Sequence, residues 1–412
     1  MNIYMSEQKE KRYILGWIYQ GGEGKMNKFY KRIIAVLSVA FLTTMASQVV
    51  SPILGEIKLS FPDTPDAAIK LIYAVVSLIS IGMSFIVGTF VYRKKRALLF
   101  GIGCFIVGGI GCTLSVSFSM LLLFRCVTGI GAGMLSPIAS SLIADFTKPQ
   151  ERTKYMGYNS FFVQLGSLIS SALAGFIASY NWRFAFLLYG IGIISFILIA
   201  IWVPESTFER ESEKQEKKNR EKLPRMVWFL AVFHFFFGAV FGSCYTNLSM
   251  GAAEYGITTK ECGIAISMSA LGAIIASIIT PYLTKLFKKF TMPVIWIVIS
   301  VLFYCMANAT TAMQLNICMV LFGTFGGPMT IVHMALAVYG SNVRTSVKCT
   351  SAVWAAGMLG SFSCPFIFEF MGALFHNEST LFGFMVNGVE ALIVAVLATL
   401  YFVVKKDNSQ GF

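Results

Sequence analysis

Long apolar runs separated by short polar loops repeat along the whole chain. About twelve runs are present, and each is close to the roughly 20 residues that a helix needs to cross a bilayer. Because peptide groups inside lipid must find hydrogen-bond partners within the protein, the runs predict helices rather than open strands. We place the spans at residues 31–56, 67–92, 97–117, 119–144, 153–178, 183–203, 226–249, 262–284, 292–308, 313–338, 349–371 and 380–404.

The composition favours a membrane protein over a soluble helical one. Hydrophobic residues make up 56% of the chain and charged residues 13%, and the mean hydropathy is +0.71. Helices of soluble proteins keep a polar face toward water, whereas residues 191–203 and 391–404 have almost no polar side chains. We therefore predict an all-α membrane protein with twelve transmembrane helices.

The net charge of +13 reports the topology rather than a nucleic-acid partner. Most lysines and arginines fall in the N-terminal segment, in alternate loops and in the central linker, including residues 93–96, 148–154 and 285–289. A basic bias on one side of the spans marks the cytoplasmic side. We expect a multi-pass protein of the cytoplasmic membrane with both termini in the cytoplasm.

A charged linker divides the spans into two sets of six. The second half repeats features of the first at an offset of about 192 residues, so that Arg93 corresponds to Lys285 and Gly131 to Gly323. Such repeats are typical of transporters in which two bundles flank a central path. We predict two pseudo-symmetric six-helix bundles, with the following organisation: a cytoplasmic segment at 1–30, bundles at 31–203 and 226–404, a linker at 204–225 and a tail at 405–412.

The first 25 residues form neither a signal peptide nor a span. Gly22-Glu23-Gly24-Lys25 stands directly before Met26 and fits a translated purine-rich ribosome-binding site. We expect Met26 to be the native start in a bacterium.

Catalytic and metal-binding patterns are missing from the sequence. We find no Ser/His/Asp arrangement, no HExxH and no phosphate-binding glycine loop. The nine cysteines match no zinc or disulfide framework. We expect no enzyme activity, no metal and no cofactor, and energy from an ion gradient.

Ionisable residues within spans are costly, and they are therefore the first functional candidates. Arg125 lies in the fourth span, His234 in the seventh, His333 in the tenth and Glu369 near the outer end of the eleventh. A histidine can titrate near neutral pH, which suits proton coupling. The alternatives are an interhelical anchor for Arg125, a satisfied core histidine, water contact for Glu369 and structural pairing for Glu390.

Polar and aromatic residues at helical spacing suggest which faces line the path. An amide needs several hydrogen-bond partners, so buried Gln and Asn residues are informative. The alternative for the neighbouring Ser and Thr residues is close helix packing. These further candidates for solute binding or coupling are Gln48, Asn159, Gln164, Tyr245, Asn247 and Trp354.

Several motifs resemble those of the major facilitator superfamily. In the fourth span Arg125 is followed by Gly129, Gly131 and Gly133, and related segments stand at residues 144–152, 181–186 and 204–206. The resemblance covers nearly the whole chain and is similar to the bacterial twelve-helix branch of drug and metabolite exporters. It implies conformational or gating roles for Gly88, Arg93, Arg96, Gly129, Gly131, Gly133, Asp145 and Arg152.

Two motifs depart from the pattern of the family. In the loop after the second span, Tyr92 replaces the usual aspartate and Lys95 the second glycine. A cytoplasmic charge network would then depend on Asp145 with Arg93 or Arg152. Residues 166–171 lack the Gly-Pro pair of the antiporter motif.

The resemblance implies a secondary transporter of a small organic solute that works by alternating access. We expect proton coupling, with efflux favoured, a monomer, and contacts with solute and membrane lipid only. The first six spans lack a central carboxylate, which favours a neutral or anionic solute with Arg125 as a counter-charge. The alternatives are an importer, symporter or facilitator of an organic anion, sugar or nucleoside, and a sensor or scaffold that does not transport.

Overall fold

The computed structural model describes residues 23–90, 93–147, 151–206, 224–338, 343–377 and 379–404. Nearly all of these residues are helical, as apolar segments in lipid require. Most of the expected N-terminal segment and linker and the tail lie outside the described residues, as does Tyr92.

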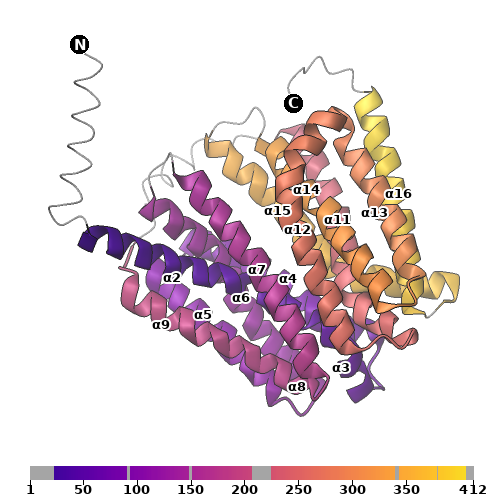
Figure 1. Cartoon of the computed structure of the whole chain (residues 1–412), viewed down its shortest axis with the longest axis horizontal. Helices are drawn as coiled ribbons and strands as arrows, with labels where there is room; N and C mark the ends of the chain where they lie inside the picture. Colours follow the sequence, from indigo (N-terminus) through magenta and orange to yellow (C-terminus); the bar gives the residue numbers. More distant parts are fainter. Residues whose placement is uncertain are drawn as a thin grey trace.

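Six spans form the first half, coloured indigo to magenta in Figure 1. Some spans consist of several helical pieces because the chain bends within them. They are α2 (Glu23–Gln48) continued by η2 (Ser51–Ile53) and α3 (Leu54–Ser60), then α4 (Asp66–Phe90), α5 (Lys94–Thr113), α6 (Phe118–Phe146), α7 (Arg152–Ala178), and α8 (Trp182–Ala185) continued by η3 (Phe186–Ile191) and α9 (Gly192–Trp202).

The second half also contains six spans. Thr258 caps the second of them, because its hydroxyl accepts from the Glu261 N–H while the Glu261 carboxylate accepts from the Thr258 N–H. They are α11 (Arg225–Glu254), α12 (Thr259–Phe287), α13 (Thr291–Ala307), α14 (Ala312–Val338), α15 (Val343–Phe375) and α16 (Thr380–Val404).

A turn at Lys288 separates α12 from α13. By length and composition, 11 uninterrupted helical segments of the described residues can cross a membrane, because Thr259–Ala307 forms one stretch of 49 residues. A straight helix of this length would extend about 74 Å, more than twice the thickness of the hydrocarbon core. Lys288, which has a φ of 49°, begins the short helix η4 (Lys288–Phe290). The stretch therefore contains two spans, and the prediction of twelve transmembrane helices is confirmed.

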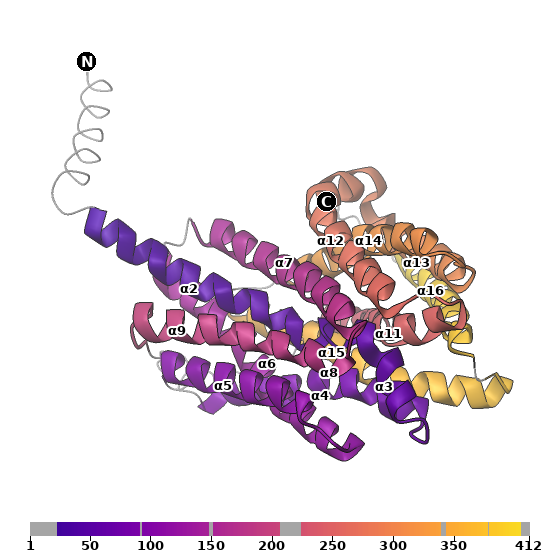
Figure 2. The same cartoon turned by 60° about the horizontal axis from the view of Figure 1, so that its bottom comes forward.

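Each half has its own buried core. One large cluster of buried hydrophobic residues comes from positions 33–203 together with Met250, and the other from positions 227–398. Figure 2 shows the two groups of helices, with α7 next to α12 where the groups meet. The second seam between the halves is formed by α4 and α15. The domain boundaries themselves stay a prediction.

Successive spans alternate in direction, so the start of α2 and the end of α16 lie on one side of the molecule. We call this the terminal side and the opposite one the distal side. Helices α3 and α8 lie on the distal side, at the bottom of Figure 1. Each candidate residue lies toward one of these two sides or between them.

Candidate functional site

The first span is broken where it meets the second half of the chain. Helix α2 ends at Gln48, and Pro52 lies in the short η2 helix that follows. The Ser51 hydroxyl donates to the Tyr245 carbonyl at 2.5 Å, and the Gly55 N–H donates to the Ser249 hydroxyl at 3.2 Å. The break thus turns polar groups of the first half toward α11.

Close packing at this position favours a glycine. A Cβ atom added to Gly55 would lie 3.1 Å from the carbonyl oxygen of Ser249. Beside it, the Thr259 hydroxyl donates to the Glu56 carboxylate at 2.7 Å. Glu56 therefore links α3 to the start of α12.

Small residues also join the halves along α7 and α12. The hydroxyls of Ser171 and Ser267 lie 2.9 Å apart, and Ser267 also donates to the Leu168 carbonyl at 2.8 Å. A Cβ on Gly175 would come within 2.8 Å of the Gly263 Cα. Helix backbones can approach this closely only where side chains are small.

These five hydrogen bonds between the halves lie on the distal side. They involve the ends of the first, fifth and seventh spans and the start of the eighth. We call this set of contacts the distal gate. Its residues are Ser51, Gly55, Glu56, Leu168, Ser171, Gly175, Tyr245, Ser249, Thr259, Gly263 and Ser267.

An aromatic pair covers the gate on its inner face. The rings of Tyr73 on α4 and Tyr245 on α11 stack with centroids 6.5 Å apart. The Tyr245 hydroxyl lies 3.0 Å from the Ser269 hydroxyl. Gln48 is buried beside Tyr245, and its side-chain oxygen has no hydrogen-bond partner. The structure thus brings the predicted residues Gln48 and Tyr245 together, and adds Tyr73.

Arg125 is completely enclosed in the first half. Its Nε donates to the Ile72 carbonyl at 2.9 Å, its Nη1 to the Tyr189 hydroxyl at 2.9 Å and its Nη2 to the Ala46 carbonyl at 2.5 Å. None of its surface is exposed. The guanidinium therefore ties α6 to α2, α4 and η3, which is the geometry of an interhelical anchor. No motif in the sequence indicated Tyr189 as its partner.

The glycines that follow Arg125 permit close helix packing. A Cβ on Gly131 would lie 2.6 Å from backbone atoms of α5, and one on Gly133 would lie 2.7 Å from backbone atoms of α4. Gly129 also faces α4. The structure places the three predicted gating glycines within the first bundle, away from the distal gate.

Two predicted histidines form a buried pair in the second half. The Nδ1 atoms of His234 on α11 and His333 on α14 lie 2.9 Å apart, with 3% and 0% of the residues exposed. The ring of Phe237 stacks on His234, and Trp354 of α15 lies against the same imidazole. A Cβ on Gly357 would meet the His234 ring at 2.5 Å. The structure therefore places His234, His333 and Trp354 in one cluster.

The other predicted residues are scattered. Asn159 and Gln164 are half-buried on α7, toward the terminal side, and the Asn159 side-chain oxygen has no hydrogen-bond partner. Asn247 is buried beside Ser243 of its own helix. Glu369 is exposed at the distal end of α15, far along the helix from Trp354.

The charge network on the terminal side differs from the prediction. Asp145 pairs with Lys94 at 2.7 Å, rather than with Arg93 or Arg152, and also accepts from the Ser206 hydroxyl at 2.8 Å. Lys94 is the first residue of α5 and is buried, whereas Arg93 just before it is exposed. Arg152 instead donates to the Ala144 carbonyl at 3.1 Å.

Nearby charges extend this network to the end of the sixth span. The guanidinium of Arg96 lies 3.6 Å from the Glu205 carboxylate, which also accepts from the Lys95 N–H. Gly88 lies near the end of α4. The network therefore joins the start of α5 to α6 and to the chain after α9.

We expect the Lys94–Asp145 pair to contribute measurably to stability. Because Lys94 is buried, a double-mutant cycle of Lys94→Ala and Asp145→Ala should give a coupling energy of about 1–3 kcal/mol in thermal or denaturant unfolding of the purified protein. The exposed pair Arg96–Glu205 is the matched control and should give roughly 0.5 kcal/mol or less. Equal coupling in both pairs would contradict this interpretation.

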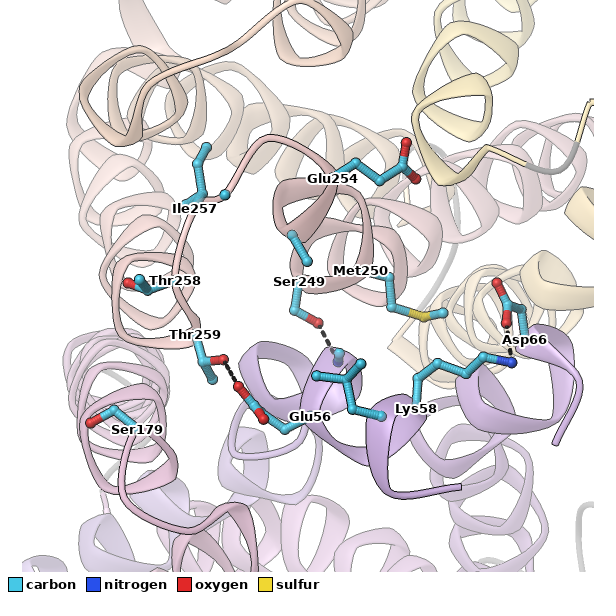
Figure 3. Close-up of a pocket in the computed structure, with 14 residues that line it drawn as sticks. Glu56, Lys58, Asp66, Ser179, Ser249, Met250, Glu254, Ile257, Thr258 and Thr259 are labelled. Atoms are coloured by element: carbon cyan, nitrogen blue, oxygen red, sulfur yellow. Dashed lines mark hydrogen bonds and ion pairs between the residues drawn. The ribbon is translucent and has the colours of Figure 1, made fainter. Parts of the chain in front are cut away.

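A pocket lies just beyond the gate on the distal side. It has a volume of about 630 Å³, and Figure 3 shows its charged and polar wall. Lys58 pairs with Asp66 at 2.9 Å on one edge, and Glu254 lies on the other. Ser249, Glu56 and Thr259 of the gate form part of its floor. The gate and this pocket therefore share part of their lining.

Comparisons with known proteins agree with the geometry. The sequence profile of the Major Facilitator Superfamily matches residues 36–338. Quinolone resistance protein NorA of Staphylococcus aureus (strain Mu50) is 25% identical over 323 residues, which cover 74% of this chain and 79% of that protein. Multidrug resistance protein 3 of Bacillus subtilis (strain 168) is 32% identical over 124 residues, or 30% of this chain, and the match spans only 24% of that relative.

Solved structures show the same fold. The xylose transporter XylE from E. coli, in an inward open conformation, superposes with a TM-score of 0.72 and covers 93% of this chain and 98% of its own. The sequence identity is 14%, so this likeness concerns the fold alone.

Proposed function

The chain belongs to the Major Facilitator Superfamily, a family of transporters and not enzymes, and we propose that it exports a small organic solute by alternating access. The distal gate is the observation that carries the proposal. It joins the two halves on one side through hydrogen bonds of serine and threonine hydroxyls and backbone groups. Such contacts can break and form again without a large desolvation cost, as alternating access requires.

The basic bias of the loops supports an orientation with the terminal side in the cytoplasm. The distal gate then faces the outside, and the structure corresponds to a state that is closed to the outside. The pocket of Figure 3 becomes an external vestibule above the closed gate.

The solute that we propose is aromatic or amphipathic and neutral or weakly charged. The Arg125 guanidinium already donates to three acceptors within the protein, so the geometry does not support a role as counter-charge for the solute. The inner face of the gate instead offers the rings of Tyr73 and Tyr245 and the amide of Gln48. The resistance functions named for NorA and multidrug resistance protein 3 support a drug-like cargo and export.

We place proton coupling at the His234–His333 pair. An Nδ1–Nδ1 contact of 2.9 Å needs one proton between the two nitrogens. A second proton at this contact would make one ring a buried cation and turn both Nδ1 atoms into donors that face each other, so its uptake must separate the two rings and with them α11 from α14. A proton taken up here would thereby change helix packing in the second half.

Flux in proteoliposomes tests both proposals. With an imposed pH gradient, a fluorescent quinolone should move against its own gradient through the wild-type protein. His234→Gln and His333→Gln should each abolish the dependence on the pH gradient, a loss of about tenfold or more in coupled flux, while solute exchange without a gradient persists. His376→Gln, at an exposed position of the same residue type, should behave as wild type.

Two results would overturn these proposals. Coupled transport that survives in both histidine variants would remove the pair from the mechanism. Wild-type protein that moves neither the quinolone nor other aromatic solutes, in either direction, would argue against export of a drug-like cargo.

A further inference from the structure

Three polar side chains meet inside the second half, away from the contact between the halves. The Ser243 hydroxyl on α11 accepts from the Asn247 amide at 2.9 Å and from the Asn387 amide of α16 at 2.7 Å. All three residues are 0% exposed. Of these three residues, only Asn247 was a candidate from the sequence.

The arrangement leaves oxygen atoms without donors. The side-chain oxygens of Asn247 and Asn387 are buried and have no hydrogen-bond partner, and the same holds for the Glu390 Oε1 atom. Glu390 lies one helical turn after Asn387, on the same face of α16. The predicted structural pairing of Glu390 is therefore not seen for this oxygen. Unsatisfied buried groups of this kind need an explanation, such as an ion or a water.

Ser243 fixes the direction of both amides. Because its oxygen accepts from the two NH₂ groups, each amide is held with its oxygen free. Helix α15 closes the region, since the Thr246 hydroxyl lies 4.0 Å from the Cys364 sulfur and Glu390 is near enough to Cys364 to interact electrostatically. The residues that carry the free oxygens thus lie on the facing helices α11 and α16, with Cys364 of α15 beside them.

We propose that Asn247, Asn387 and Glu390 bind a sodium ion, with Ser243 as a positioning residue. Every free atom is an acceptor, and hard cations take oxygen ligands of these types. One carboxylate balances one monovalent charge. A water could donate to two of the oxygens but would leave the carboxylate charge uncompensated in a low-dielectric site. A proton on Glu390 could be donated to only one of the two amide oxygens and would leave the other unsatisfied.

Thermal unfolding of the purified full-length protein tests the site without any transport. At equal ionic strength, sodium chloride should raise the apparent melting temperature by about 2–4 °C over choline chloride, because a ligand that binds only the folded state stabilises it. Asn387→Ala, Asn247→Ala and Glu390→Gln should each lose this sodium-specific shift, judged against their own baseline in choline.

Asn159→Ala is the matched control, because Asn159 also carries a buried oxygen without a partner but lies alone on α7. This variant should keep the full shift. Equal melting temperatures in sodium and choline, or a sodium shift that survives in the three site variants, would overturn the proposal. The measurement needs no transported solute, so its outcome is independent of whether the proposed export is correct.

Discussion

Arg125→Ala is expected to lower the apparent melting temperature of the purified protein by on the order of 10 °C. Removing the guanidinium leaves the carbonyls of Ile72 and Ala46 and the Tyr189 hydroxyl with one donor fewer in a buried site. Each lost hydrogen bond to the charged guanidinium contributes about 1.5–3 kcal/mol. The loss should appear in differential scanning fluorimetry and as poor recovery from membranes.

Two further variants serve as controls for this result. Arg93→Ala removes an exposed arginine of the same half and should leave the melting temperature unchanged. Arg125→Lys keeps the charge but lacks the planar fork, so we expect an intermediate loss. An Arg125→Ala protein with normal stability but no transport would instead restore the predicted role in solute binding.

Joining Ser171 to Ser267 through cysteines should stop transport. The two hydroxyls lie 2.9 Å apart, so an oxidised Ser171→Cys/Ser267→Cys protein would hold the distal gate shut. We expect flux to fall by about tenfold or more on oxidation, because the gate must open in each cycle. Reduction with dithiothreitol should restore it.

Each single cysteine variant should be insensitive to oxidation, which controls for the nine native cysteines. Mass spectrometry of the peptides would verify the bond. Continued flux through a fully cross-linked protein would show that the α7–α12 contact is static and that the gate opens elsewhere.

The fold was predictable because lipid leaves few alternatives. Apolar runs of bilayer length predicted twelve spans, and the structure contains them with shifts of a few residues at the ends. The loop between the eighth and ninth spans was predicted from its basic residues. In the structure the helical stretch is nearly continuous there, and the turn at Lys288 separates the two spans. The bending of the first span at Ser51–Ile53 was not predicted, because Pro52 alone does not say where a helix resumes.

The site was less predictable, because it depends on which residues of distant spans face one another. His234, His333 and Trp354 were each identified, but their separation along the chain gave no sign that they meet. Arg125 was identified for its cost in the membrane, whereas its partners are two backbone carbonyls and a tyrosine, which carry no motif. Lys94 was missed because the rotation of α5 at its first turn decides which of four adjacent basic residues points inward.

The chemistry of the distal gate determines how the two conformations respond to the ionic strength of the medium. Apart from the Glu56 carboxylate, whose partner is the neutral Thr259 hydroxyl, the gate consists of hydroxyl and peptide groups that carry no net charge, and Debye screening acts on charges and hardly on neutral dipoles. The balance between the two conformations should therefore be nearly the same in dilute and in salty media. A transporter with such a gate would keep the same resting conformation at low and at high external salt concentration.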